Sequence, residues 1–256
     1  MRRMLLIGIG AGDPEYVTQQ AIRALNEVDV FFVMDKGEEK DDLMALRRQV
    51  CERFIEDDSY RIVAVRDPQR DRTADAYAAA VEDWRRERAR IWERLIDEQL
   101  GDDGVGAILV WGDPSLYDSV LAILDSLLAA GRLRFDVEVI PGISAIAALC
   151  ARHAIALNRV GEAVHITTGR RLAREGLPAN APDVVVMLDA HCAFQTLRAD
   201  GLDIYWGAYL GTPDEILISG ALEEVRDEIV RVRVRARARK GWIMDTYLLR
   251  RRTRDG

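Results

Sequence analysis

LVWGDPSLYDS, residues 109–119, is a stretch in which an apolar run gives way abruptly to a turn of small and polar residues. The run at 105–110 is interrupted by a single glycine, as expected of a buried strand. Asp113 is predicted to cap a following helix, with Pro114 at the first helical position, where its missing N–H is not needed. That helix is expected to end at Gly131. Helix capping explains the turn, but it does not explain the aromatic, hydroxyl and carboxylate groups gathered around it.

Short apolar runs alternate with longer segments of helical periodicity, which predicts an α/β protein. Strands are expected at Met4–Ile9, Val28–Met34, Arg61–Val65, Ala107–Val110, Val137–Ile140, Ala163–Thr168, Val184–Leu188, Ile204–Tyr209, Glu215–Ser219 and Trp242–Leu249. Helices are expected at Pro14–Asn26, Asp42–Ile55 and Ala74–Leu100. The spacing predicts two α/β domains, residues 1–156 with a long helical insertion at about 36–105, and residues 157–256.

The composition excludes several classes of protein. The formal net charge of −7 argues against a general nucleic-acid binder, because such proteins normally carry a basic excess. The three cysteines and three histidines show no metal-ligand spacing, so we expect no metal site and reduced thiols in a cytoplasmic protein. No segment approaches the ~20 apolar residues of a membrane span. The N-terminal MRRMLLIGIGAG is interpreted as a first strand, because its apolar run is too short for a signal peptide.

The segment VRVRVRARAR, residues 230–239, fits two structures. Its strict alternation is compatible with a strand that has an arginine face. Leu222, Val225 and Ile229 nevertheless begin a helical spacing that continues through the segment, with glutamates at its start, arginines at its end and Gly241 as a C-cap. We predict a helix whose arginines form a solvated face.

The first loop, LIGIGAGDPEYVT at residues 6–18, joins a strand to a helix through three glycines. A dinucleotide site would require G-x-G-x-x-G, whereas Gly8, Gly10 and Gly12 give G-x-G-x-G. Asp13 would also compete for the position of a pyrophosphate at the helix N-terminus. Asp13 is therefore predicted to be an N-cap, with Pro14 at the first helical position.

Three further stretches end strands in small and polar residues. They are PGISA (141–145), VVVMLDA (184–190) and YLGTPDE (209–215). Ser144 is predicted to cap the helix that follows it. Ordinary turn chemistry explains each stretch alone, but together they place polar groups at strand ends in both halves, where open α/β sheets bind ligands.

The ordered set of IGIGAGDP, WGDPSLYDS, PGISA, Met187-Leu188-Asp189 and GTPDE resembles the motifs of the tetrapyrrole methylases, over essentially the whole chain. The resemblance implies two α/β domains with S-adenosyl-L-methionine bound in a cleft between them, S-adenosyl-L-homocysteine as its product, and a homodimer. One departure is Ala11, where relatives usually have proline. The cofactor-binding residues that the resemblance implies are Trp111, Gly112, Asp113, Leu116, Tyr117, Ser144, Ala145, Leu188, Leu210 and Ile243.

Within the family, the resemblance is strongest to members that methylate C-1 of precorrin-5 and release its acetyl group as acetate in aerobic cobalamin biosynthesis. The stretch DKGEEKDDLMALRRQVC, residues 35–51, is among the features that indicate this branch. Acetyl loss requires attack of water on a carbonyl, so a general base and a hydrogen-bond donor are expected. The candidate catalytic residues are Asp35, Asp118 and Asp13 as bases and Tyr117 as a donor. Because the substrate carries many carboxylates, basic residues are expected to bind it: Lys36, Arg70, Arg72, Arg170 and Arg171.

Other functions stay open at this point. A methylase of the same family could act on another tetrapyrrole, on RNA or on a protein. An NAD-dependent oxidoreductase is disfavoured by Asp13, and the acidic composition disfavours RNA. A non-catalytic cofactor-binding module is disfavoured because polar loops are expected from both halves.

Overall fold

The computed structural model describes residues 1–35, 41–68 and 77–252, and it divides into two compact units. The first unit comprises Met1–Gly10 and Pro14–Ile143, and the second comprises Ala11–Asp13 and Ser144–Gly256. The main division therefore lies after Ile143, earlier than the boundary expected at residue 156, because the helix that starts there packs on the second sheet. Both units are α/β, as predicted.

The sheet of the first unit has five strands, all parallel, in the order β3-β2-β4-β1-β5. Their bounds are β1 Arg3–Gly8, β2 Val30–Asp35, β3 Arg61–Arg66, β4 Val105–Val110 and β5 Asp136–Ile140. All five strands were predicted, with bounds that differ by one or two residues. Because the strands are parallel, the loops that follow them leave from one edge of the sheet.

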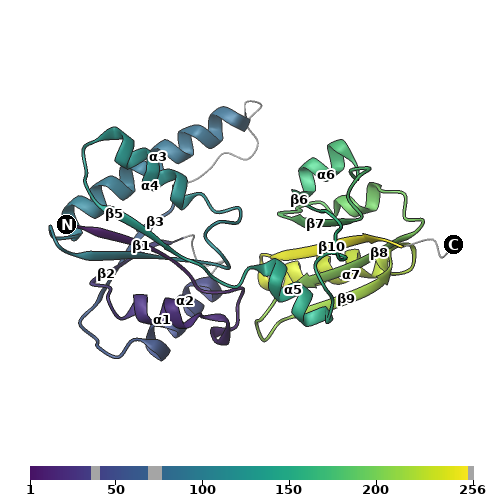
Figure 1. The fold of residues 1–256 in the computed structure, drawn as a ribbon, viewed down its shortest axis with the longest axis horizontal. Coiled ribbons are helices and arrows are strands. Elements are labelled where there is room, and N and C mark those ends of the chain that lie inside the picture. The colour runs from purple at the N-terminus through teal and green to yellow at the C-terminus, as the bar shows by residue number, and fades with distance from the viewer. Residues whose placement is uncertain (36–40, 69–76, 253–256) are drawn as a thin grey trace. The chain divides into compact units, whose positions relative to one another are not determined.

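Helices cover both faces of this sheet (Figure 1), with α3 (Tyr77–Gln99) and α4 (Val120–Ala130) on one face and α1 (Gln19–Leu25) and α2 (Asp41–Phe54) on the other. Strand β1 is buried on both sides, which explains its unbroken apolar sequence. Its residues alternate between the two layers. Met4 and Leu6 join the core under α3 and α4, and Leu5 and Ile7 join the core under α1 and α2.

The long connection between β2 and β4 contains α2 and α3. It also contains β3, the strand expected at Arg61–Val65, which extends the sheet as an edge strand beside β2. Three of the substrate-binding candidates, Lys36, Arg70 and Arg72, lie outside the described residues.

The start of the first helix differs from the prediction. Pro14–Tyr16 forms a short 3₁₀ turn, and α1 begins only at Gln19. Thr18 is the N-cap, and its hydroxyl accepts a hydrogen bond from the amide of Ala21 at 3.1 Å. The assignment of Asp13 as the N-cap is therefore wrong, because the turn delays the helix until a second capping side chain is reached.

The second unit has a mixed sheet in the order β6-β7-β10-β8-β9, in which β6 and β7 are parallel and the other neighbours are antiparallel. The strands are β6 Val164–Thr168, β7 Asp183–Met187, β8 Leu202–Ala208, β9 Ile216–Ala221 and β10 Asp245–Arg251. The helices are α5 Ala145–His153, α6 Gly169–Glu175 and α7 Leu222–Lys240, with a 3₁₀ turn, η3, at Ala193–Thr196. The core lies among α6, η3, α7 and the sheet and includes Phe194, Trp206 and Tyr247.

The ambiguous arginine-rich segment is helical, as predicted, and forms the second half of α7. Gly241 ends it in the left-handed conformation. One of its arginines departs from the predicted solvated face. Arg233 is buried, because it lies four residues after Ile229 and three before Ala236, on the face that packs on the sheet.

In the described part of the chain, no helix is long and apolar enough to cross a membrane, and no group of three or more potential ligands could hold a metal ion. Cys51, Cys150 and Cys192 are free thiols. Burial raises the pKa of Cys51 and of Cys192 to about 11, so both thiols stay protonated at neutral pH.

Candidate active site

The carboxyl ends of β1, β4 and β5 are joined by direct packing of backbone on backbone. A Cβ atom at Gly8 would lie 2.6 Å from the amide nitrogen of Gly142 and 2.9 Å from the carbonyl oxygen of Gly112. A Cβ at Gly142 would clash with that same carbonyl oxygen. Only glycine fits at residues 8 and 142, and so the three strand ends approach more closely than side chains would allow.

Hydrogen bonds fix this arrangement. The amide of Gly112 donates to the carbonyl of Gly10 at 2.8 Å, which forms an isolated bridge between the first loop and the turn after β4. The Asp113 carboxylate accepts the amide of Gly142 at 2.9 Å through Oδ2 and the amide of Ser115 at 2.9 Å through Oδ1. Asp113 therefore ties the loop after β4 to the loop after β5.

This arrangement corrects the prediction for Asp113. Helix α4 begins only at Val120, with Ser119 as its N-cap residue, so Asp113 does not cap it. Asp118 instead accepts the amide of Val120 at 2.6 Å. Burial raises the pKa of Asp113, but the hydrogen bonds from Ser115 and Gly142 outweigh it and lower the pKa below its ordinary value.

Three of the four candidate catalytic residues lie at the carboxyl edge of the first sheet, whereas the fourth, Asp13, lies in the tip of the first loop, which belongs to the second unit. Asp35 is the last residue of β2, and Tyr117 and Asp118 come after the turn at Asp113. Tyr117 has a φ of 54° and is 45% exposed. The left-handed conformation costs a non-glycine residue about 1–2 kcal/mol. Leu116, the residue before Tyr117, and Trp111, the residue before Gly112, are half-buried.

The tip of the first glycine loop, Ala11–Asp13, belongs to the second unit. A Cβ at Gly12 would clash with the carbonyl oxygen of Leu210, so the two backbones touch there. Leu210 is buried and starts the GTPDE turn, in which Glu215 Oε2 accepts the amide of Gly211 at 2.8 Å. Arg152 on α5 pairs with the other oxygen of Glu215 at 2.6 Å.

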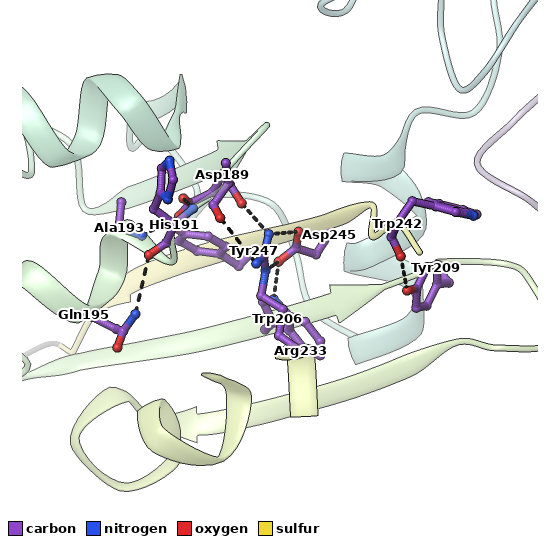
Figure 2. A network of polar contacts seen from close by, with 11 residues as sticks. Asp189, His191, Ala193, Gln195, Trp206, Tyr209, Arg233, Trp242, Asp245 and Tyr247 are labelled. Carbon is purple, nitrogen blue, oxygen red and sulfur yellow. Dashed lines mark hydrogen bonds and ion pairs between the residues drawn. The ribbon is translucent and has the colours of Figure 1, made fainter. Parts of the chain in front are cut away.

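The loop after β7 exposes Leu188 and buries Asp189. Leu188 has a φ of 53° and is 64% exposed, whereas Asp189 is 5% exposed. The Asp189 carboxylate accepts the amides of His191 at 2.9 Å and Ala193 at 2.6 Å, and also the hydroxyl of Tyr247 at 2.7 Å. Figure 2 shows these groups converging on the end of β7.

A buried ion pair supports this loop (Figure 2). Arg233 Nε donates to Asp245 Oδ2 at 2.8 Å, and Trp206 Nε1 donates to the same oxygen at 3.0 Å. Arg233 Nη2 also donates to the backbone carbonyl of Asp189 at 2.7 Å. Burial lowers the pKa of Arg233, but Asp245 outweighs this and raises it, so the guanidinium stays charged.

The prediction missed this network. Its members come from the loop after β7 and from α7, β8 and β10, far apart in the sequence. Two signals were available: an arginine on the apolar spacing of α7, and Asp245 and Tyr247 two residues apart on one strand, which places them on one face.

The remaining predicted residues lie in the second unit. Ser144 caps α5 as predicted, accepting the amide of Ala147 at 3.2 Å, and Ala145 starts that helix. Ile243 is half-buried in the loop before β10.

The two substrate-binding candidates among the described residues, Arg170 and Arg171, lie in the first turn of α6. Arg171 pairs with Glu175 at 3.1 Å on the surface. The structure thus brings together Trp111 to Asp118 at one sheet edge of the first unit and holds Leu188, Leu210 and Ile243 in loops of the second.

The whole-chain comparisons identify the class. The family model of the tetrapyrrole (corrin/porphyrin) methylases matches residues 3–226, and the chain belongs to this family. Its members are C-methyltransferases that use S-adenosyl-L-methionine. This assignment leaves no support for the NAD-dependent alternative.

Two relatives match over nearly the full length. The chain is 50% identical over 250 residues to precorrin-6A synthase [deacetylating] of Sinorhizobium sp, covering 98% of this chain and 95% of that protein. It is 40% identical to a solved structure described as a putative cobalamin synthesis related protein (CobF) from Corynebacterium diphtheriae, with a TM-score of 0.86 and coverage of 99% and 100%. At 19% identity, a uroporphyrin-III C-methyltransferase of Thermus thermophilus, solved with S-adenyl homocysteine, shares the fold with a TM-score of 0.59, covering 96% of this chain and 91% of that one.

The close packing at Gly142 predicts a large effect of one methyl group. Gly142→Ala should lower the free energy of unfolding by about 2–3 kcal/mol, because its Cβ would overlap the Gly112 carbonyl. Gly101→Ala is the matched control, since a Cβ there meets nothing within 4 Å, and it should change stability by less than about 0.5 kcal/mol. Urea denaturation of the two variants measures the difference. Equal stabilities would show that the three strand ends are not tightly packed.

The carboxylate of Asp113 predicts a second, pH-dependent effect. Asp113→Asn should destabilise the protein by about 1–3 kcal/mol at pH 7, because its amide group would face the N–H of Gly142 or Ser115. Since folding lowers the pKa of Asp113 from 3.8, its contribution is complete above that value and is lost as the pH falls through the folded pKa. The gap between variant and wild type, measured by urea denaturation, should therefore close at low pH. A gap that stays constant with pH would exclude a role for the charge.

Proposed function

We propose that this protein transfers a methyl group from S-adenosyl-L-methionine to C-1 of precorrin-5 and releases the acetyl group of the substrate as acetate, giving precorrin-6A. The observation that carries the proposal is the 50% identity, over nearly the whole of both chains, to a protein named precorrin-6A synthase [deacetylating]. The full-length match at 40% identity to a structure described as cobalamin synthesis related supports the same pathway.

The described residues fit the methyl donor. The turn at Gly112 and Asp113 would contact the polar parts of the donor, and its hydrogen bonds to Gly10 and Gly142 hold it in one conformation. Tyr117 and Leu188 expose apolar surface at strand ends, as a nucleoside requires. The full set of proposed contacts is Trp111, Gly112, Asp113, Leu116, Tyr117, Ser144, Ala145, Leu188, Leu210 and Ile243.

S-adenosyl-L-methionine supplies an electrophilic methyl group when it is bound. The protein's part in the transfer is to hold donor and acceptor carbon in near-attack geometry, so no covalent enzyme intermediate is required. The raised pKa of the buried thiols of Cys51 and Cys192 agrees with this, because a protonated thiol is a poor nucleophile.

Acetate release needs a base that activates water. Asp35 and Asp118 are the proposed bases, since both end or follow strands at the carboxyl edge of the first sheet, and Tyr117 is the proposed donor to the acetyl oxygen. Asp118 also accepts the first amide of α4, which orients its carboxylate. Arg170 and Arg171, together with Lys36, Arg70 and Arg72, are proposed to bind the carboxylates of the substrate.

The direct test is the product. The purified protein is incubated with precorrin-5 and S-adenosyl-L-methionine that carries a deuterated methyl group, and product mass and free acetate are measured together. One labelled methyl gained, one acetyl lost and an equivalent of acetate are expected. A methyl gain with the acetyl retained would remove the deacetylating activity, and no reaction despite cofactor binding would indicate a different acceptor. A reaction without the methyl donor is the control.

We also propose a cytoplasmic homodimer, on the basis of the family resemblance and the reduced thiols. Light scattering after size-exclusion chromatography should give a mass of two chains at micromolar concentration. A mass of one chain across the same concentrations would contradict the dimer.

A further inference from the structure

Two loops of the protein share one local geometry but differ in one residue. In the turn after β4, Gly112 has a φ of 72° and precedes Asp113, whose carboxylate accepts the amide two residues later. In the loop after β7, Leu188 has a φ of 53° and precedes Asp189, whose carboxylate also accepts the amide two residues later. A glycine takes the left-handed conformation without strain, but a leucine does not.

The leucine gains no burial in exchange for this strain. Leu188 is 64% exposed, so packing does not explain why the position carries a large apolar residue. Contacts of the neighbouring residues must therefore hold the backbone of Leu188 in this conformation. Its exposed side chain is then available to contact a ligand.

Asp189 is fixed through both its side chain and its backbone. Tyr247 donates to the carboxylate, and Arg233 donates to the backbone carbonyl of the same residue at 2.7 Å. Residue 169 must be glycine, since a Cβ there would overlap the Asp189 carboxylate. Three elements, β10, α7 and the start of α6, thus converge on the residue next to Leu188.

The opposite end of the same strand carries an ion pair of a different kind. Asp183, the first residue of β7, is fully buried and pairs with Arg250 of β10 at 2.5 Å. Arg250 also donates to the carbonyl of Ala156. This pair joins strand ends that lie away from the Leu188 loop, since β7 runs from Asp183 to Met187. It provides a reference for what a buried charge contributes to stability alone.

We infer that Asp189, Arg233 and Tyr247 are positioning residues that hold Leu188 in its left-handed conformation, so that its exposed side chain receives the methyl donor. The inference rests on the proposed function, which places Leu188 among the cofactor contacts. These three residues set the affinity for the cofactor without touching it.

The test is isothermal titration calorimetry of the full-length protein with S-adenosyl-L-homocysteine. Tyr247→Phe removes only the hydroxyl that donates to Asp189, and it should weaken binding about tenfold, which corresponds to about 1.4 kcal/mol. Arg233→Lys keeps a charge beside Asp245 but loses the second arm that reaches the Asp189 carbonyl, and it should weaken binding in the same direction.

Asp189→Asn and Asp183→Asn form a matched pair. Both replace a buried carboxylate on or beside β7 by an amide of the same size, and both should lower the melting temperature. Only Asp189→Asn should raise the dissociation constant, whereas Asp183→Asn should leave it within about twofold of the wild type. Equal dissociation constants for Asp189→Asn, Tyr247→Phe and wild type would overturn the inference, because the network would then be structural only.

A double-mutant cycle separates this inference from the proposed function. If Tyr247 acts through Leu188, then Tyr247→Phe should change the dissociation constant less than about twofold once Leu188→Ala is present. Full additivity of the two substitutions would overturn the inference and leave the cofactor site intact. Normal binding by Leu188→Ala itself would remove Leu188 from the proposed cofactor contacts and overturn the inference with it. Failure of wild-type protein to bind S-adenosyl-L-homocysteine would instead overturn the proposed function.

Discussion

The contact of backbone with backbone at the carboxyl ends of β1, β4 and β5 is the constraint on which the first unit depends. Because Gly8 and Gly142 have no side chains, the Gly112 carbonyl can pack against the backbone of both residues. The turn after β4 must then cross the end of β1, and that crossing brings the Asp113 carboxylate within 2.9 Å of the Gly142 amide. The chain leaves this turn through Tyr117 in a left-handed conformation. The exposed aromatic side chain of Tyr117 thus follows directly on the closely packed turn.

The second unit achieves a fixed strand-end loop by other means. There the loop after β7 is held by buried polar side chains, not by glycines packed on each other. Asp189 takes the part that Asp113 takes in the first unit, since each accepts the amide two residues later and one more distant donor. The difference is that the Asp189 carboxylate and carbonyl also depend on Tyr247 and Arg233, which come from the end of the chain.

The layers and strands of the fold could be predicted from the sequence, because burial of one or both faces of an element gives its apolar residues a regular spacing or an unbroken run. The ten strands among the described residues, and α7 with its strand-like alternation, were predicted in this way. The caps were less predictable. Asp113 and Asp13 precede proline as an N-cap would, but in each case a short turn intervenes, and the helix begins after Ser119 or Thr18. The carboxylate of Asp113 instead accepts the amide of Gly142, 29 residues later, and no local sequence pattern predicts a partner at that separation.

The buried network was harder to predict than the strands for a related reason. An arginine on a helix rich in arginine is expected to be solvated, and in the sequence only its spacing from Ile229 and Ala236 distinguishes Arg233 from its neighbours. Replacing a buried ion pair by apolar residues is often neutral or stabilising. A contribution to stability therefore does not explain why this position carries a charged group. An apolar core would, however, remove the Arg233 donor from the Asp189 carbonyl and the Tyr247 donor from its carboxylate, and the loop would then be free to release the strain at Leu188. The network is therefore better explained by the single conformation that it imposes on the loop than by the stability it adds.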